Sequence, residues 1–173
     1  MKIFLTTFVL AIIIIISTIT ITVLTSAAFE RDYMGEWNLS DKSSTIEAKS
    51  EHLNNFVILL EKNKDKDFLD NGKIFFQNQN SSFDSNLAAL KTLAKRLEEI
   101  KGMDPASFQY NTAIQQITQQ EQGEAGAMIG VFYDCYALRQ HYIVCGFDGL
   151  IVLGSLGVMI IVIILAVSGV IEP

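Results

Sequence analysis

Two long uncharged apolar stretches, one near each end of the chain, restrict what this sequence can fold into. The first runs from Ile3 to Ala28 and the second from Leu150 to Ile171. Each is longer than the roughly 20 apolar residues that a helix needs to cross a hydrocarbon core ~30 Å thick. Backbone groups inside lipid must be paired within their own segment. Both stretches are therefore predicted to be transmembrane helices, with the residues between them folded outside the lipid.

A cleaved signal peptide is the alternative for the first stretch. Lys2 would supply its charged start, and Ser26-Ala27-Ala28 resembles a small-residue cleavage site. The apolar part of a signal peptide has only about 7 to 15 residues, which is shorter than this stretch. We therefore expect an uncleaved transmembrane anchor over residues 1–28.

Three hydroxyl side chains share one side of this first stretch. Thr18, Thr22 and Thr25 fall at helical spacing among isoleucines. Their hydroxyls either bond across a helix pair or bond the carbonyl one turn back in their own helix. We favour the second arrangement.

The charge of the chain lies between the two apolar stretches. The sequence has 13 Lys and Arg against 19 Asp and Glu, a formal net charge of −6, and all of them except Lys2 and Glu172 fall in the central region. An acidic region repels the phosphates of nucleic acid, which excludes nucleic acid as a partner. Long loops cross a membrane largely regardless of their own charge. We expect both termini in the cytoplasm, residues 29–148 outside a plasma or inner membrane, and residues 149–173 as the C-terminal span.

The central region begins with patterns typical of two amphipathic helices. Ser44-Thr45-Ile46-Glu47 is a capping box, and the helix that it starts should fade in the charged run from Glu61 to Asp67. The second helix begins at Asp84 or Ser85, and Gly102 closes it.

A third helix is predicted to begin at Asp104, with Pro105 in its first turn, where the missing N–H costs nothing. The short connection makes it antiparallel to the preceding helix. Residues three and four apart then continue as the a and d positions of a coiled-coil heptad towards the second apolar stretch: Ile114, Ile117, Glu121, Glu124, Met128, Val131, Cys135, Leu138, Tyr142 and Cys145. The predicted fold class is an all-α membrane protein, with two transmembrane helices flanking an extracytoplasmic antiparallel helical bundle.

Three glycines interrupt this third helix. Gly123, Gly126 and Gly130 each cost about 1 kcal/mol relative to alanine inside a helix. The spacing of Gly126 and Gly130 allows two helix backbones to approach closely. Either another helix packs tightly there or the helix bends, and we favour tight packing.

Cys135 and Cys145 are the only cysteines, and the expected topology places both outside, where oxidising conditions pair thiols. On a continuous helix their Cα atoms would lie ~15 Å apart, whereas a disulfide tolerates less than ~7 Å. Either the helix breaks between Arg139 and His141, or the cysteines bond other chains or stay reduced. Because glycines follow Cys145, we favour a break with an intrachain disulfide.

Asn38 and Asn80 stand in the N-x-Ser pattern and fall in predicted loops, so both are candidate glycosylation sites. The pattern is short, and it matters only in a cell that has the glycosylation machinery.

The sequence contains no arrangement that points to catalysis. Glu121 and Glu124 lie one turn apart, but no histidine follows at the spacing of a di-iron bundle, so a solvated face is the better interpretation. His52 and His141 have no second ligand at helical spacing. There is no catalytic triad, phosphate-binding loop or paired-cysteine metal motif. We therefore expect no enzyme, no cofactor and no metal.

The leading functional hypothesis is a structural or accessory two-pass membrane protein. Its spans contact membrane lipid, and its helical ectodomain and spans mediate homo-oligomer formation or incorporation into a larger membrane complex. The heptad that runs into a span, the glycine patch and the short tails outside the spans motivate this hypothesis.

The alternative is an extracytoplasmic ligand-binding sensor or solute-capture module that signals through the transmembrane helices of a partner. The order span, bundle, span resembles in outline the periplasmic sensors of chemoreceptors, without a shared motif. Five aromatic side chains are candidates to line a pocket between the helices: Phe56, Phe75, Phe83, Phe108 and Tyr110.

Overall fold

A computed structural model describes residues 2–69, 82–117 and 122–168 of the chain. Every regular element in these ranges is a helix, which confirms the all-helical class. The helices are α1 (Lys2–Asp32), α2 (Met34–Lys42), α3 (Ile46–Asp67), α4 (Phe83–Lys101), α5 (Phe108–Gln116), α6 (Gln122–Gln140), α7 (Tyr142–Gly146) and α8 (Asp148–Val167).

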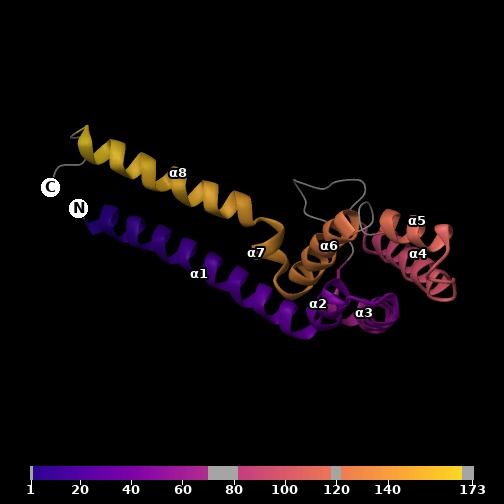
Figure 1. Ribbon diagram of the computed structural model, residues 1–173. Helices are drawn as coiled ribbons and strands as arrows, with labels where there is room; N and C mark the ends of the chain where they lie inside the picture. The colour runs from indigo at the N-terminus through magenta and orange to yellow at the C-terminus, as the bar shows by residue number, and fades with distance from the viewer. Residues whose placement is uncertain (1, 70–81, 118–121, 169–173) are drawn as a thin grey trace.

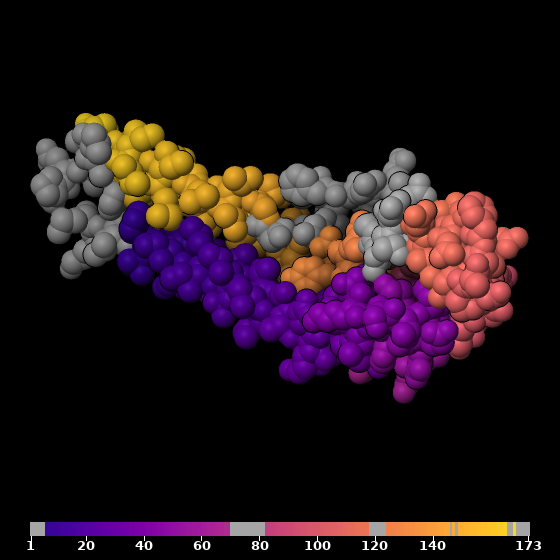
Figure 2. Space-filling model, viewed as in Figure 1, coloured from indigo at the N-terminus to yellow at the C-terminus, as the bar shows by residue number. Residues whose placement is uncertain are grey.

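The molecule has a narrow part and a broad part. Helices α1 and α8 lie side by side and run in opposite directions, so the start of α1 and the end of α8 are at the same end of the molecule (Figure 1). Helices α2 to α6 gather at the other end, and the space-filling view shows them as a wider head on the α1–α8 rod (Figure 2). The short helix α7 joins the head to α8 (Figure 1).

Hydroxyl side chains cap the starts of α3, α4 and α5. Thr45, not Ser44, caps α3, because its side chain accepts a hydrogen bond from the N–H of Ala48. Ser82 caps α4 in the same way, and Gly102 follows its last turn as predicted. These caps satisfy N–H groups that have no partner within the helix.

The predicted start of the third helix at Asp104 is wrong. Asp104 instead accepts a hydrogen bond from the N–H of Ala106 at 2.9 Å, which makes a local turn through Pro105. Ser107 caps the helix, and α5 therefore begins at Phe108. None of the residues of α5 is buried, and the Phe108 side chain is 82% exposed.

The core of the head is aromatic. Phe56 of α3, Phe83 of α4 and Phe132 of α6 are completely buried, and the Phe132 ring centroid lies 5.1 Å from that of Phe83 and 6.3 Å from that of Phe56. Fully burying one such side chain contributes about 1.5–3 kcal/mol. Buried leucines of α3 and α4 extend the core away from α1: Leu53, Leu60, Leu87, Leu90 and Leu97.

Polar contacts join α3 and α4 around this core. The buried Ser50 hydroxyl donates to Glu98 at 2.8 Å, and the Lys64 ammonium lies 2.6 Å from a carboxylate oxygen of Asp84. The hydrogen bond from Ser50 and the contact with Lys101 hold the pKa of the Glu98 carboxyl below its usual value.

The helix that carries the predicted heptad is broken at His141. This residue has φ −143° and ψ 62° between α6 and α7, so the expected break next to Arg139 and His141 is confirmed. The part of the heptad around Glu121 lies outside the described residues.

Candidate functional site: the α1–α8 pair and its aromatic junction

Helix α1 has the length and composition of a membrane span. Among the described residues, Thr6–Asp32 is the one helix long and apolar enough to cross a membrane, and Gly149–Leu165 of α8 is a shorter apolar helix. A signal sequence near an N-terminus passes the same test, so composition alone does not separate the two.

The contacting faces of α1 and α8 carry small or hydroxyl side chains, and their outer faces carry large aliphatic ones. Ala11, Thr18 and Thr25 are buried on α1, and Ser155 and Val162 are buried on α8. Most of the large side chains exposed on the two helices are branched aliphatics, among them Val9, Leu10, Ile13, Ile16, Ile19, Val23, Leu24, Leu153, Ile160, Ile161, Ile163 and Ile164, although Ser17, Thr20, Thr22 and Gly154 are exposed as well. This pattern is the reverse of a water-soluble helix pair, and it is typical of helices that pack together in lipid.

The threonine hydroxyls of this stripe, buried at Thr18 and Thr25 and exposed at Thr22, donate hydrogen bonds within α1. Thr18 donates to the carbonyl of Ile14 at 2.9 Å, Thr22 to that of Thr18 at 3.0 Å and Thr25 to that of Ile21 at 2.8 Å. The favoured interpretation of the threonine stripe is therefore confirmed. The seven-residue spacing of Ala11, Thr18 and Thr25 was the sequence signal for the contacting face of α1, and sequence reasoning did not use it.

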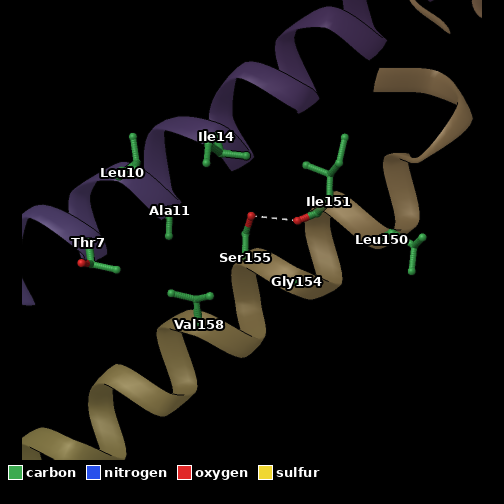
Figure 3. Close-up of a pocket in the computed structure, with 9 residues that line it drawn as sticks. All are labelled: Thr7, Leu10, Ala11, Ile14, Leu150, Ile151, Gly154, Ser155 and Val158. Carbon is green, nitrogen blue, oxygen red and sulfur yellow. Dashed lines mark hydrogen bonds between the residues drawn. The ribbon is translucent and has the colours of Figure 1, made fainter. Parts of the chain in front are cut away.

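A groove remains between α1 and α8. Its volume is about 420 Å³, and Ala11 and Ser155 point toward one another across it (Figure 3). The Ser155 hydroxyl donates to the carbonyl of Ile151 in its own helix at 2.7 Å. The lining is almost entirely apolar and consists of Thr7, Leu10, Ala11, Ile14, Leu150, Ile151, Gly154, Ser155 and Val158.

An aromatic junction connects this helix pair to the head. Phe29 in the last turn of α1 and Tyr33, which directly follows α1, meet Tyr136 of α6 with ring centroids 5.5 Å and 5.7 Å away. The ring of Phe29 also meets that of Tyr133 at 5.6 Å, and the ring of Tyr33 meets that of Phe68 at 5.0 Å. The end of α1 is therefore part of the same buried cluster as the core of the head.

Hydrogen bonds fix this junction to the last turn of α3. The Tyr33 hydroxyl donates to a carboxylate oxygen of Asp67 at 2.6 Å. Burial, and then the hydrogen bond to Asp67, raise the pKa of the Tyr33 phenol far above its ordinary value. Burial and the nearby Asp32 and Asp67 carboxylates also raise the pKa of Tyr136.

Helix α6 holds the same turn of α3 from the other side. The N–H of Leu69 donates to the carbonyl of Cys135 at 2.9 Å, and the Arg139 side chain donates to the carbonyl of Lys66 at 3.1 Å. Residues 66–69 at the end of α3 therefore form hydrogen bonds both with Tyr33, which follows α1, and with α6. Long-range contacts of this kind leave no periodic signal in the sequence.

The predicted disulfide is wrong. Cys135 and Cys145 are both buried, and they are not bonded to one another. The helical hydrogen bonds stop and start again at the break: the N–H of His141 donates to the carbonyl of Ala137 in α6, and the N–H of Cys145 donates to the carbonyl of His141 in α7.

Two of the three glycines of α6 do not meet another part of the described chain. Gly126 and Gly130 are exposed, and a Cβ added to either would have no atom within 4 Å. Gly123 lies in the first turn of α6. Close packing of a helix against Gly126 and Gly130 stays a prediction.

The other candidate residues are scattered. Asn38 is exposed on helix α2, so its predicted loop is wrong, and Asn80 lies outside the described residues. His52 lies 2.8 Å from a carboxylate oxygen of Glu36 and links α2 to α3. Glu124 and His141 are exposed. In the part of the chain that the structure describes, no three His, Cys, Asp or Glu side chains are grouped to hold a metal ion.

The aromatic candidates for a pocket separate in the structure. Phe56 and Phe83 are core residues, Tyr110 is half-buried and Phe108 is exposed, while Phe75 lies outside the described residues.

No protein-family model, no curated protein and no solved structure matches this chain.

Proposed function

We propose that this chain is a two-pass membrane protein, with α1 and α8 as the spans and the helical head on the extracytoplasmic side. We propose further that it has a structural or accessory role, assembling with its own copies or within a larger membrane complex. The observation that carries the membrane assignment is the reversed pattern of the helix pair, in which Ala11 and Ser155 are buried while aliphatic side chains such as Ile13 and Ile161 are exposed.

The length of α1 supports this assignment. Lys2 and Glu30 bound its uncharged part, and a rise of 1.5 Å per residue separates them by ~42 Å. A bilayer with its headgroups is about 40–45 Å thick. The uncharged part of α1 is therefore long enough to cross a bilayer.

The exposed glycines of α6 support assembly. Two glycines in one helix cost about 1 kcal/mol each relative to alanine, and the described chain places nothing against Gly126 or Gly130. A helix from another chain would gain contact area there, because no side chain keeps the backbones apart.

Mass photometry of the full chain in mild detergent tests the assembly. We expect oligomers, and we expect Gly130→Leu to shift them towards monomers. Gly35→Leu is the matched control, since Gly35 of α2 is also exposed and also has nothing within 4 Å of a built Cβ. Monomers alone for the wild-type chain, with no co-purifying partner, would contradict the proposal.

The orientation is tested separately by labelling in intact cells. A Phe108→Cys variant places a thiol at an exposed position of the head. We expect a membrane-impermeant maleimide to label it from outside the cell. Labelling only after lysis would place the head in the cytoplasm, which contradicts the proposed orientation but not the assignment of two spans.

One observation favours the alternative of a ligand-binding module. A surface hollow of about 320 Å³ lies between α4 and α6 and is lined by Ala89, Thr92, Leu93, Arg96, Glu124 and Met128. Thermal-shift measurements with free amino acids and small organic acids test it. A stabilising shift that Ala89→Trp abolishes would support the alternative, and no shift with any of these solutes would count against it.

A further inference from the structure

The register of the antiparallel helix pair fixes which residues of α1 and α8 share a depth in a bilayer. Ala11 and Ser155 point toward one another (Figure 3), and both helices rise about 1.5 Å per residue in opposite directions. From this pair towards the head, Thr18 of α1 therefore comes level with Asp148, the first residue of α8. The depth at which α8 enters the membrane thus also sets the depth of α1.

The two ends of α8 limit the hydrocarbon core. Asp148 is the charge at the start of its apolar run, and the exposed Ser168 follows its last residue. Asp148 and Ser168 lie ~30 Å apart along the helix axis, and the hydrocarbon core of a bilayer is also about 30 Å thick. A charged carboxylate inside that core is costly. The core therefore extends from Asp148 towards Ser168 and not towards the head.

The exposed side chains of α1 change in character within one residue of the same level. From Val9 to Ile16, every exposed side chain of α1 is a branched aliphatic one. Beyond Ile16, exposed hydroxyl side chains interrupt the aliphatic ones at Ser17, Thr20, Thr22 and Ser26. Hydroxyl groups are better solvated among headgroups than among acyl chains. The surface of α1 thus indicates the same boundary as the start of α8.

The short helix α7 supplies a third indication. It contacts both α1 and α8 and directly precedes α8 on the side of the head (Figure 1). Its residues Tyr142 and Ile143 are exposed. Tyrosine is enriched at the headgroup level of membranes, where its ring and its hydroxyl meet different surroundings. Helix α7 therefore has the composition of a segment that lies among headgroups.

We infer that the outer edge of the hydrocarbon core crosses the helix pair at the level of Thr18 and Asp148, so that the last turns of α1 lie outside it. The inference rests on the proposed function, because it takes α1 and α8 to be spans. Phe29 of the aromatic junction lies ~16 Å beyond this edge along α1, whereas one headgroup layer is about 5–8 Å thick. The last turns of α1 therefore hold the head clear of the headgroups. Acyl chains contact only the outward faces of α8 and of α1 before Thr18.

Cysteine accessibility at two matched positions of α1 tests the inference. Val23 and Ile13 are 60% and 53% exposed, and they lie ~7.5 Å from the level of Thr18 on opposite sides of it. Full-length Val23→Cys and Ile13→Cys variants are placed in phosphatidylcholine nanodiscs, which leave both membrane faces open to a charged, water-soluble maleimide. We expect Val23→Cys to react several-fold faster, because the reactive thiolate forms in water and not among acyl chains.

A third variant, Leu153→Cys, supplies the matched control on α8. Leu153 is 64% exposed, and the register places it at the same depth as Ile13. It should therefore react as slowly as Ile13→Cys. The wild-type chain, whose Cys135 and Cys145 are buried, gives the background rate.

The outcome that overturns the inference differs from those that overturn the proposed function. Equally slow reaction of Val23→Cys and Ile13→Cys would mean that the hydrocarbon core reaches further along α1, which overturns the inference and leaves both spans in the membrane. Fast reaction of Leu153→Cys would remove α8 from the membrane, and fast reaction of Ile13→Cys would remove α1. Either of these two results would overturn the proposed function together with the inference.

Discussion

The head and the α1–α8 pair bury opposite kinds of side chain. In the head, the rings of Phe56, Phe83 and Phe132 are completely buried, and the ion pairs of α3 and α4 lie at the surface. In the pair, Ala11 and Ser155 are buried, whereas isoleucines such as Ile13 and Ile161 are exposed. The same chain therefore packs its helices in two different ways. On the proposed membrane assignment, the head meets water and the helix pair meets lipid, so burial has to be interpreted together with the solvent around each region.

The largest effect is expected from removing a central ring of the head. Phe132→Ala should lower the free energy of unfolding by about 3–5 kcal/mol, because the lost burial leaves a cavity between three helices. Denaturant unfolding in detergent, followed by circular dichroism, measures it. The control Phe108→Ala removes an exposed ring and should change stability by less than about 0.5 kcal/mol. Equal effects of the two substitutions would mean that the head has no aromatic core.

A matched pair of charged substitutions tests whether the two regions meet different solvents. Ile13 of α1 and Ile58 of α3 are 53% and 59% exposed. Their exposure alone therefore predicts that the two positions tolerate a charged side chain equally well. In lipid, Ile13→Arg should raise the free energy of membrane insertion by about 2.5–3.5 kcal/mol. Ile58→Arg should be nearly neutral in water.

An insertion assay in microsomes measures the first substitution, and thermal unfolding measures both. If Ile13→Arg is tolerated as well as Ile58→Arg, the exposed isoleucines of α1 do not face lipid, and the contrast between the two regions disappears.

A smaller effect is expected at the junction where the two regions meet. Tyr33→Phe removes the hydrogen bond to Asp67 and leaves a carboxylate without this donor, at a cost of about 1–3 kcal/mol. The substitution should also change the pH dependence. The folded state keeps the Tyr33 proton because the phenol is buried and bonded, whereas the unfolded state releases it near the ordinary value of 10.0.

The unfolded state thus binds fewer protons above about pH 10, so the stability of the wild-type chain falls as pH rises through that value. Stability curves for Tyr33→Phe should be flatter there, with the remaining slope coming in part from Tyr136, whose pKa is also raised. An unchanged slope in Tyr33→Phe would show that the phenol does not titrate differently in the folded state.

The smallest effect is expected from a reducing agent. Because Cys135 and Cys145 are not bonded, a reductant should leave the melting temperature unchanged. Alkylation of the unfolded, non-reduced chain should add two labels by mass spectrometry. A single label or none would show that a thiol is oxidised, and the path of the chain through α6 and α7 would need revision.

Sequence periodicity was sufficient for the parts of the fold that depend on neighbours along the chain. The apolar length of α1 and the end of α4 at Gly102 both follow from local composition, whereas the break next to His141 was expected only as the way to form a disulfide that is absent. It failed where local signals competed, since Asp104 and Ser107 both offer a cap and only Ser107 caps a helix. It also failed at Cys135 and Cys145, because the presence of a break says nothing about the direction that the chain takes after it.

The sequence by itself determined that the chain is helical and that two apolar stretches enclose an acidic centre. Only the tertiary structure decided which residues of those stretches are buried, that a groove remains at Ala11 and Ser155, and that Tyr33 bonds Asp67. The physical reason is that hydropathy and helix period act within one turn or one segment. A contact between α1, α3 and α6 depends on how three helices cross, and the crossing is set by the shapes of side chains that are far apart in the sequence.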